Sequence, residues 1–152
     1  MKISHSALNM ITISEGLKTK AYKDSAGIPT IGIGTITYPN GTKVKMGDTC
    51  TEESAFSWLE SNVQNKVTEV GKALAGVKLT QNQIDAIASL TYNIGASGFL
   101  NSTACRLIKE NPNDPKIKDA WLSWNKATID GKKQEVKGLT LRRKREYQLY
   151  TS

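Results

Sequence analysis

The spacing of hydrophobic residues changes along the chain, and each change indicates a different kind of structure. In residues 4–14 the apolar residues recur at helical spacing, and Gly16 follows as a residue that can end a helix in a left-handed turn. From residue 20 to about 44, single apolar residues fall among Gly, Pro, Asp and Asn, which favours short strands and tight turns. The sequence PNGT at 39–42 predicts a hairpin turn.

From residue 51 the helical spacing returns and continues to the end of the chain. Residues 51–75 predict one long helix, because a single apolar stripe runs along them: Ala55, Trp58, Leu59, Val63, Val67, Val70 and Leu74. A capping box over Thr80–Gln83 predicts the start of the next helix. Further helices are predicted over about 99–109, from Asp114 with Pro115 in its first turn, and over about 139–150.

These elements predict an α+β fold that is mostly helical, with a small β-rich N-terminal lobe and a larger helical C-terminal lobe. The length of 152 residues fits a single domain, 1–152. We expect one lobe over about 15–60, with the helix 51–75 linking it to the other. The second lobe is expected to contain 76–152 together with 1–14.

Composition and charge narrow the classes of protein to consider. The chain is 38% hydrophobic, with a net charge of +7 and a pI near 9.4, so its surface should attract polyanions such as nucleic acid, anionic lipid or an anionic cell wall. No apolar run reaches the roughly 20 residues of a membrane span, and no secretory signal is expected. Cys50 and Cys105 are expected to be free thiols, and a single histidine excludes metal sites built on several histidines.

Two acids and a threonine lie close together in the stretch EGLKTKAYKDSAGIPTIGIG at 15–34. Glu15 falls at the negative end of the first predicted helix, where the field disfavours a charged carboxylate and suits a proton donor. Asp24 falls in a turn rich in N–H groups, which suits a carboxylate, and Thr30 could hold a water. Such a pair fits the acid and base of glycoside hydrolysis, although acids near glycine turns are more often solvated or capping residues.

The same stretch resembles the signature of the phage T4-type lysozymes, the endolysins of glycoside hydrolase family 24. The matching residues are Glu15-Gly16, Ala21-Tyr22-Lys23-Asp24, Gly27, and Thr30-Ile31-Gly32-Ile33-Gly34. Three later segments resemble family landmarks in the same order: LTYNIGASGF at 90–99, WLSWNKA at 121–127 and GLTLRRKRE at 138–146. The resemblance therefore covers almost the whole chain.

The resemblance implies a two-lobed lysozyme-like fold and a muramidase, which hydrolyses the β-1,4 bond between N-acetylmuramic acid and N-acetylglucosamine in peptidoglycan. It implies that Glu15 is the general acid and that Asp24 and Thr30 position and activate the attacking water, with inversion at the anomeric carbon. No metal or organic cofactor is implied. The expected partner is the glycan strand of peptidoglycan, and the expected state is a monomer.

Further residues are assigned through the same resemblance. Ile36 and Phe99 match positions that line the substrate cleft of the family, and Arg142 matches an arginine that pairs with the catalytic Glu. Thr35 departs from the pattern, because many relatives have His after the second glycine of the GxG motif. We expect this change to affect stability more than chemistry.

The C-terminal part is strongly basic, with seven Lys or Arg and two Glu from Lys132 to Glu146, a local balance of +5. It is either a solvated helix face or a surface attracted to the anionic wall or to outer-membrane lipid. Other classes to consider are a lytic transglycosylase, an inactive wall-binding module and a nucleic-acid-binding protein, although no nucleic-acid-binding motif is present. We expect synthesis in the cytoplasm of an infected, Gram-negative bacterium and release through a membrane lesion made by another protein.

Overall fold

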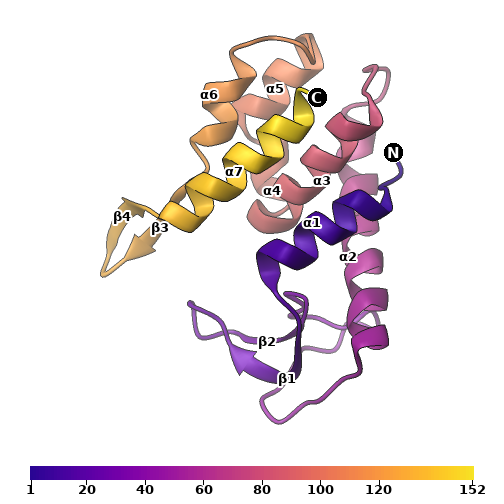
Figure 1. Cartoon of the computed structure of the whole chain (residues 1–152), viewed down its shortest axis with the longest axis vertical. Coiled ribbons are helices and arrows are strands. Elements are labelled where there is room, and N and C mark those ends of the chain that lie inside the picture. The colour runs from indigo at the N-terminus through magenta and orange to yellow at the C-terminus, as the bar shows by residue number, and fades with distance from the viewer. The chain divides into compact units, whose positions relative to one another are not determined.

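The computed structural model describes residues 1–152, which form two compact units (Figure 1). The first unit contains residues 5–65, and the second contains 66–152 together with 1–4. Residues 1–14 are expected from the sequence in the helical lobe, whereas the structure groups only residues 1–4 with it. None of the helices combines the length and the apolar character that crossing a membrane requires.

The first unit begins with helix α1 (His5–Glu15), followed by the antiparallel strands β1 (Lys18–Lys23) and β2 (Pro29–Gly32). Irregular loops with single β-bridges then lead to helix α2 (Glu52–Ala73), which runs through both units. The helix predicted over residues 4–14 and the short strands predicted between residues 20 and 44 are confirmed by α1, β1 and β2. The predicted turn at 39–42 is confirmed as well, because a β-bridge joins the residues that flank it and Gly41 has a φ of +88°.

Strand β2 packs closely on α2 within the first unit. A Cβ atom placed on Gly32 would lie 3.1 Å from the Cβ of Ala55, and Gly32 has a φ of +65°. Both the approach and the backbone conformation therefore require glycine at this position. The fully or almost fully buried apolar side chains in this part of the first unit are Ile31, Ile33, Val44, Ala55, Leu59 and Val63.

The second unit is a bundle of helices around one apolar core. Its helices are the end of α2, then α3 (Gln81–Ile94), α4 (Ala96–Leu100), α5 (Thr103–Glu110), α6 (Ile117–Leu122) and α7 (Lys137–Tyr150). The core residues are Val70, Leu74, Ala86, Ile87, Leu90, Phe99, Cys105, Leu107, Ile108, Ile117, Trp121 and Tyr150. The mostly helical α+β class predicted from the sequence is confirmed.

Helix boundaries in this unit follow local capping rules. The Thr80 hydroxyl accepts from the N–H of Gln83 at 3.1 Å, and the Gln83 side chain accepts from the N–H of Thr80 at 2.9 Å, so the predicted capping box is confirmed. The single helix predicted over 99–109 is wrong, because α4 ends at Leu100 and Ser102 then caps α5 by accepting from the N–H of Cys105 at 3.1 Å. The helix predicted from Asp114 begins three residues later, after a turn in which that carboxylate accepts from the N–H of Lys116 at 2.9 Å.

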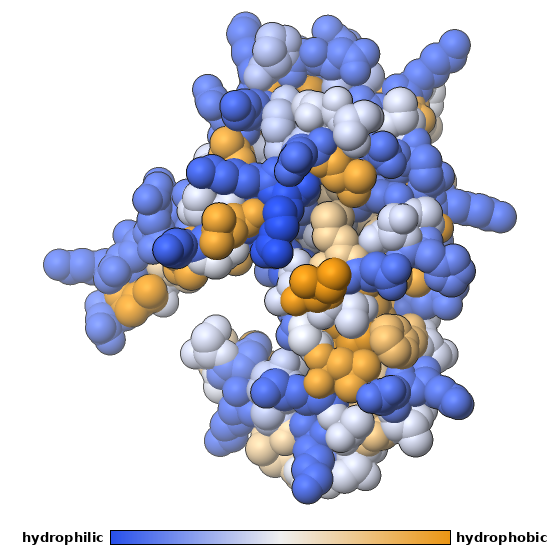
Figure 2. Space-filling model, viewed as in Figure 1, coloured by the Kyte–Doolittle hydropathy of each residue, from blue (hydrophilic) through white to orange (hydrophobic).

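A second hairpin was not predicted from the sequence. Strands β3 (Lys126–Ile129) and β4 (Lys132–Glu135) pair antiparallel across Asp130 and Gly131, whose φ values are +51° and +77°. These angles match the turn that Asp-Gly favours between two strands. Almost every residue of the hairpin is exposed, and Figure 2 shows it as a largely hydrophilic projection of the second unit, with an apolar patch toward its end.

Candidate active site

Glu15 is the last residue of α1, as predicted. The N–H of Gly16 donates to the carbonyl of Thr12 at 2.8 Å, and Gly16 takes a φ of +74°. Glycine reaches this left-handed conformation without strain, so the helix ends directly after the acid. The chain then turns into β1, and the half-buried Glu15 side chain lies at the junction.

Asp24 follows β1 and is held by the backbone of its own turn. Its Oδ1 accepts from the N–H groups of Ala26 and Ile28, both at 2.9 Å. The N–H of Asp24 donates to the carbonyl of Ile28 at 3.0 Å, which closes the turn. Two donors on one oxygen suit an ionised carboxylate, which can only accept, and they fix its direction. The second oxygen, Oδ2, is left to accept from another group.

Thr30 lies in β2 and is only 3% exposed. Its hydroxyl donates to the carbonyl of Ile28 at 2.9 Å. Because the hydroxyl has one hydrogen and two lone pairs, its remaining capacity is to accept. The main chain of Ile28 therefore orients both Asp24 and Thr30, one through its N–H and the other through its C=O.

Tyr22 lies near the three predicted catalytic residues and was not predicted as a site residue from the sequence. It stands opposite Thr30 in the pairing of β1 with β2, two residues before Asp24. Burial and the nearby charges of Glu15 and Asp24 raise the pKa of Tyr22. The structure thus brings these groups together within the first unit. The alternation of side chains along a strand, which places Tyr22 and Asp24 two residues apart, is the signal that could have found it.

The other predicted site residues have different environments. Ile36 belongs to the first unit and is 45% exposed. Phe99 has no exposed surface in the core of the second unit, so its burial does not support a direct contact with substrate. Arg142 is 6% exposed in α7, and its Nε lies 3.4 Å from Oε2 of Glu146. Its pairing with Glu15 remains a prediction.

Thr35 is buried beside β2. Its N–H donates to the carbonyl of Ile31 at 3.0 Å, and its own carbonyl accepts from the N–H of Ile31 at 2.8 Å. Its hydroxyl oxygen is buried without a hydrogen-bond partner. A buried hydroxyl without a partner lowers the free energy of unfolding. A substitution at Thr35 that removes this hydroxyl could therefore stabilise the protein.

A buried ionic cluster lies in the second unit around Glu146, which is fully buried. Arg143 Nε lies 2.7 Å from its Oε1, the Ser89 hydroxyl donates to Oε2 at 2.5 Å, and the Trp121 indole donates to Oε1 at 3.3 Å. The interpretation of the basic C-terminal segment as one solvated helix face is therefore wrong. Two of its arginines, Arg142 and Arg143, are buried against a carboxylate.

Two surface pockets lie in the second unit, and neither is lined by a residue of the candidate active site. One lies between α6 and α7, and its lining includes Lys118, Leu122 and Lys144. The other lies beside the C-terminus, next to Tyr150. The candidate active site is therefore defined by Glu15, Asp24 and Thr30 and by the hydrogen bonds of the last two.

Comparison with known proteins matches this arrangement to one family. The family model for phage lysozyme matches residues 12–146. The endolysin of Salmonella phage P22 is 40% identical over 152 residues, which is 100% of this chain and 99% of that protein. An endolysin from Escherichia coli O157:H7 phage FAHEc1 has a similar structure, with a TM-score of 0.90, 43% identity, and coverage of 99% of this chain and 93% of the other. The muramidase domain of SpmX from Asticaccaulis excentricus has a TM-score of 0.85 and 29% identity over 99% of this chain and 98% of the other.

The mostly helical fold, together with these similarities over almost the whole chain, defines a glycoside hydrolase of the lysozyme type. The chain belongs to the phage lysozyme family. The predicted family, the enzyme class and the endolysin function are therefore confirmed, and a lytic transglycosylase is not favoured.

Proposed function

We propose that this chain cleaves the β-1,4 bond between N-acetylmuramic acid and N-acetylglucosamine in peptidoglycan with inversion, using Glu15, Asp24 and Thr30. The observation that carries the proposal is the shared support of Asp24 and Thr30 by the main chain of Ile28, at 2.9 Å in each case. Both side chains are left with acceptor capacity only. One water can donate one hydrogen to each of them, which directs its own lone pair away from the protein and toward a sugar carbon.

In the proposed reaction, the water oxygen attacks the anomeric carbon while the bond from that carbon to the bridging oxygen breaks. The electron pair of the broken bond goes to the bridging oxygen, which takes the proton of Glu15. The water gives its proton to Asp24. Inverting enzymes need room for a water, which corresponds to carboxyl groups roughly 6.5–9.5 Å apart.

One digestion separates the possible activities. Purified peptidoglycan sacculi are treated with the protein, and the new chain ends are identified by mass spectrometry. Reducing N-acetylmuramic acid ends support hydrolysis, anhydro-muramyl ends indicate transglycosylation, and no new ends indicate binding alone. NMR of the first product then tests the stereochemistry, because inversion gives the α-anomer and an initial β-anomer would contradict the proposal.

We further propose that the exposed hairpin β3–β4 and the exposed face of α7 attract anionic lipid of the outer membrane. The hairpin carries Lys126, Lys132 and Lys133 on its surface, and Ile129 near its end is 43% exposed. Lysines near an anionic membrane surface contribute about 1 kcal/mol each, and salt weakens the attraction.

Sedimentation with anionic and with neutral lipid vesicles tests this part of the proposal. The double variant Lys132→Gln/Lys133→Gln should lose much of the binding to anionic vesicles, whereas Lys72→Gln/Lys78→Gln is the matched control and should not. If the hairpin variant instead loses binding to lipid-free sacculi, the hairpin recognises the wall, and the lipid proposal is wrong.

The expected site of synthesis and the oligomeric state remain proposals. We propose that the protein is made in the host cytoplasm, reaches the wall after another protein opens the membrane, and works as a monomer. Expression alone followed by cell fractionation tests the first point, because appearance outside the inner membrane without a second protein would contradict it. Light scattering of the purified protein tests the second.

A further inference from the structure

The pocket between α6 and α7, called the α6–α7 pocket below, has a volume of about 350 Å³ and belongs to the second unit. On each of the two helices its lining residues are spaced about one turn apart, so they share one face of the helix. The lining residues are Lys118, Leu122, Lys144, Tyr147, Gln148 and Thr151.

The direction of the two helices places the two lysines at opposite ends of the pocket. Asn125, which follows α6, donates to the hydroxyl of Thr140 near the start of α7 at 3.1 Å. The hydroxyl of Tyr150 at the end of α7 donates to the carbonyl of Pro112, which precedes α6, at 2.6 Å. The helices are therefore antiparallel, and the first lining residue of one lies opposite the last lining residue of the other. Each helix has a lysine as its first lining residue.

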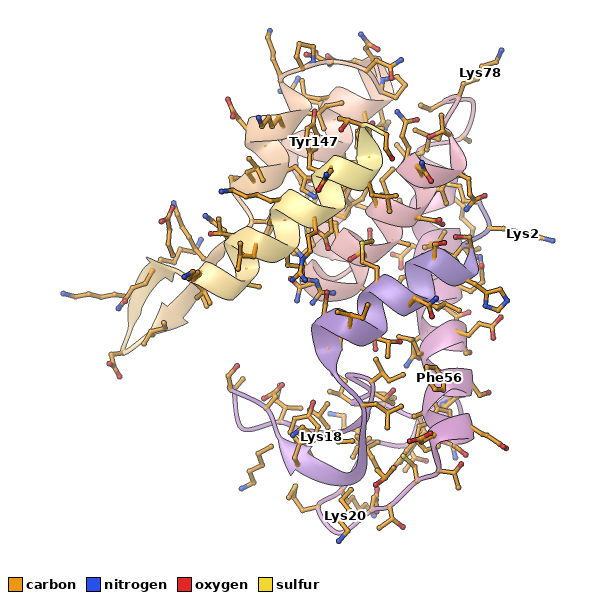
Figure 3. All side chains as sticks on the ribbon, viewed as in Figure 1. Lys2, Lys18, Lys20, Phe56, Lys78 and Tyr147 are labelled. Carbon is orange, nitrogen blue, oxygen red and sulfur yellow. The ribbon has the colours of Figure 1, made fainter.

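An apolar wall separates the two lysines. It consists of Leu122 and the ring of Tyr147, which is labelled in Figure 3. The Tyr147 ring stacks on Tyr150 with 5.8 Å between the centres and meets Trp121 edge-on at 6.0 Å. Because Tyr150 and Trp121 are buried in the core, the Tyr147 ring is already held in place before a ligand binds. Gln148 adds an amide that can both donate and accept.

The polar groups of the pocket favour a ligand with more than one anionic group. Lys118 and Lys144 are exposed, and neither forms an ion pair within the chain. Burial, then the charges of Asp114 and Asp119, raise the pKa of Tyr147 above 10.0, so its phenol is neutral at lower pH and can donate to a carboxylate. Neither of these two aspartates lines the pocket.

The wall that the enzyme acts on contains a ligand of this kind. The stem peptide of peptidoglycan is short and carries several carboxylates, which are separated by amide groups and alanine methyl groups. An anionic lipid has its charge in one head group, so it would use only one end of the pocket. Two separated cations with an apolar wall between them therefore favour the peptide.

We propose that the α6–α7 pocket binds the stem peptide of peptidoglycan, with one carboxylate on Lys118 and another on Lys144. The peptide between them lies against Leu122 and Tyr147. This inference rests on the proposed function, because it takes peptidoglycan as the substrate. Stem peptides recur along every glycan strand, so holding one of them raises the effective concentration of the strand at the enzyme.

Free stem peptide, released from sacculi by an amidase, is the probe. Its titration into ¹⁵N-labelled protein should shift the amide signals of residues 118–122 and 144–151. Lys118→Gln/Lys144→Gln should weaken the binding by about 3- to 10-fold, because each lysine forms an exposed ion pair with the peptide. Lys72→Gln/Lys78→Gln removes the same charge from exposed positions of the same unit, and this control should bind the peptide like the wild type.

Two substrates separate this role from a structural one. On sacculi, Lys118→Gln/Lys144→Gln should raise KM severalfold and leave kcat unchanged. On glycan strands from which an amidase has removed the peptides, this variant and the wild type should behave alike. A structural role would instead lower Tm and change both substrates equally.

The inference is overturned if Lys118→Gln/Lys144→Gln binds the free peptide like the wild type. The same holds if this variant loses binding only to anionic vesicles, since the lysines then belong to a lipid-binding surface. In both cases the proposed function stands as long as the wild type produces reducing ends on sacculi. If the wild type produces no new ends, the proposed function fails, whereas the titration with free peptide still measures the pocket alone.

Discussion

The two units of the molecule use carboxylates in opposite ways. In the first unit, Glu15 and Asp24 are half-buried, and Asp24 is held by main-chain N–H groups that leave one of its oxygens available. In the second unit, Glu146 is fully buried, and both of its oxygens are occupied by arginine, serine and tryptophan side chains. A carboxyl that does chemistry must keep a free oxygen within reach of substrate, whereas one that stabilises a core must not.

The largest effect is expected at the proposed acid. Glu15→Gln keeps the shape of the side chain but cannot give a proton, so hydrolysis of sacculi should fall by about 10²–10⁴-fold. The free energy of unfolding should stay close to that of the wild type. The control is Glu53→Gln, an exposed acid of the same unit in α2, which should keep full activity. Substantial hydrolysis by pure Glu15→Gln would remove Glu15 from the mechanism.

The next effect should appear in stability, at the buried cluster. Glu146→Gln leaves buried arginines without their counter-charge, which should lower the free energy of unfolding by about 3–5 kcal/mol in urea denaturation. The control is Glu110→Gln, which breaks the Arg106–Glu110 pair at 3.4 Å between side chains that are 62% and 64% exposed. That change should cost no more than about 1 kcal/mol. Equal costs for the two variants would show that the contrast between buried and exposed acids is wrong.

A smaller effect separates stability from chemistry within the second unit. Thr80→Ala removes the cap of α3 and should cost about 1 kcal/mol. The rate of peptidoglycan hydrolysis should not change at a temperature where both proteins are folded. Thr80→Ser, which keeps the hydroxyl, should recover most of the lost stability, and a failure to do so would assign the loss to the methyl group instead.

The smallest effect at neutral pH concerns one tyrosine in each unit. Burial and the hydrogen bond to Asp48 raise the pKa of Tyr38 to about 12, and burial raises that of Tyr150 further. Both groups hold their protons more tightly in the folded state than in the unfolded state, where the value is near 10.0. Their contribution to stability is therefore complete below pH 10 and is lost as the pH rises toward 12.

Urea denaturation at pH 9, 10 and 11 measures this loss. Tyr38→Phe and Tyr150→Phe should each show a shallower fall in the free energy of unfolding above pH 10 than the wild type. Identical slopes for all three proteins would mean that neither tyrosine contributes to the alkaline loss.

Local rules explain what could be predicted from the sequence. Gly16 after an acid, PNGT between strands and the capping box at Thr80 each act within a few residues, so their patterns identified the helix end, the hairpin turn and the helix start. The hairpin β3–β4 was missed although Asp130-Gly131 marks its turn. Its strands consist mostly of Lys, Gln and Glu in place of the usual apolar alternation.

Contacts between distant segments explain what could not be predicted. The sequence RRKRE offers four cations around one acid, and nothing local distinguishes the buried Arg143 from the exposed Lys144. The distinction comes from the packing of α7 on α3, where Ser89 donates to Glu146 across a separation of 57 residues in the sequence.

The turn that holds Asp24 has a consequence for how the enzyme can diverge between hosts. Its donors are main-chain groups of Ala26 and Ile28, while the side chains of Ser25, Ala26 and Ile28 are exposed. Replacement of these side chains leaves the donors in place, so natural variation can alter the exposed surface of the turn while the orientation of the Asp24 carboxylate is kept. Proline at position 26 or 28 is the exception, because it lacks the N–H that donates to the Asp24 carboxylate.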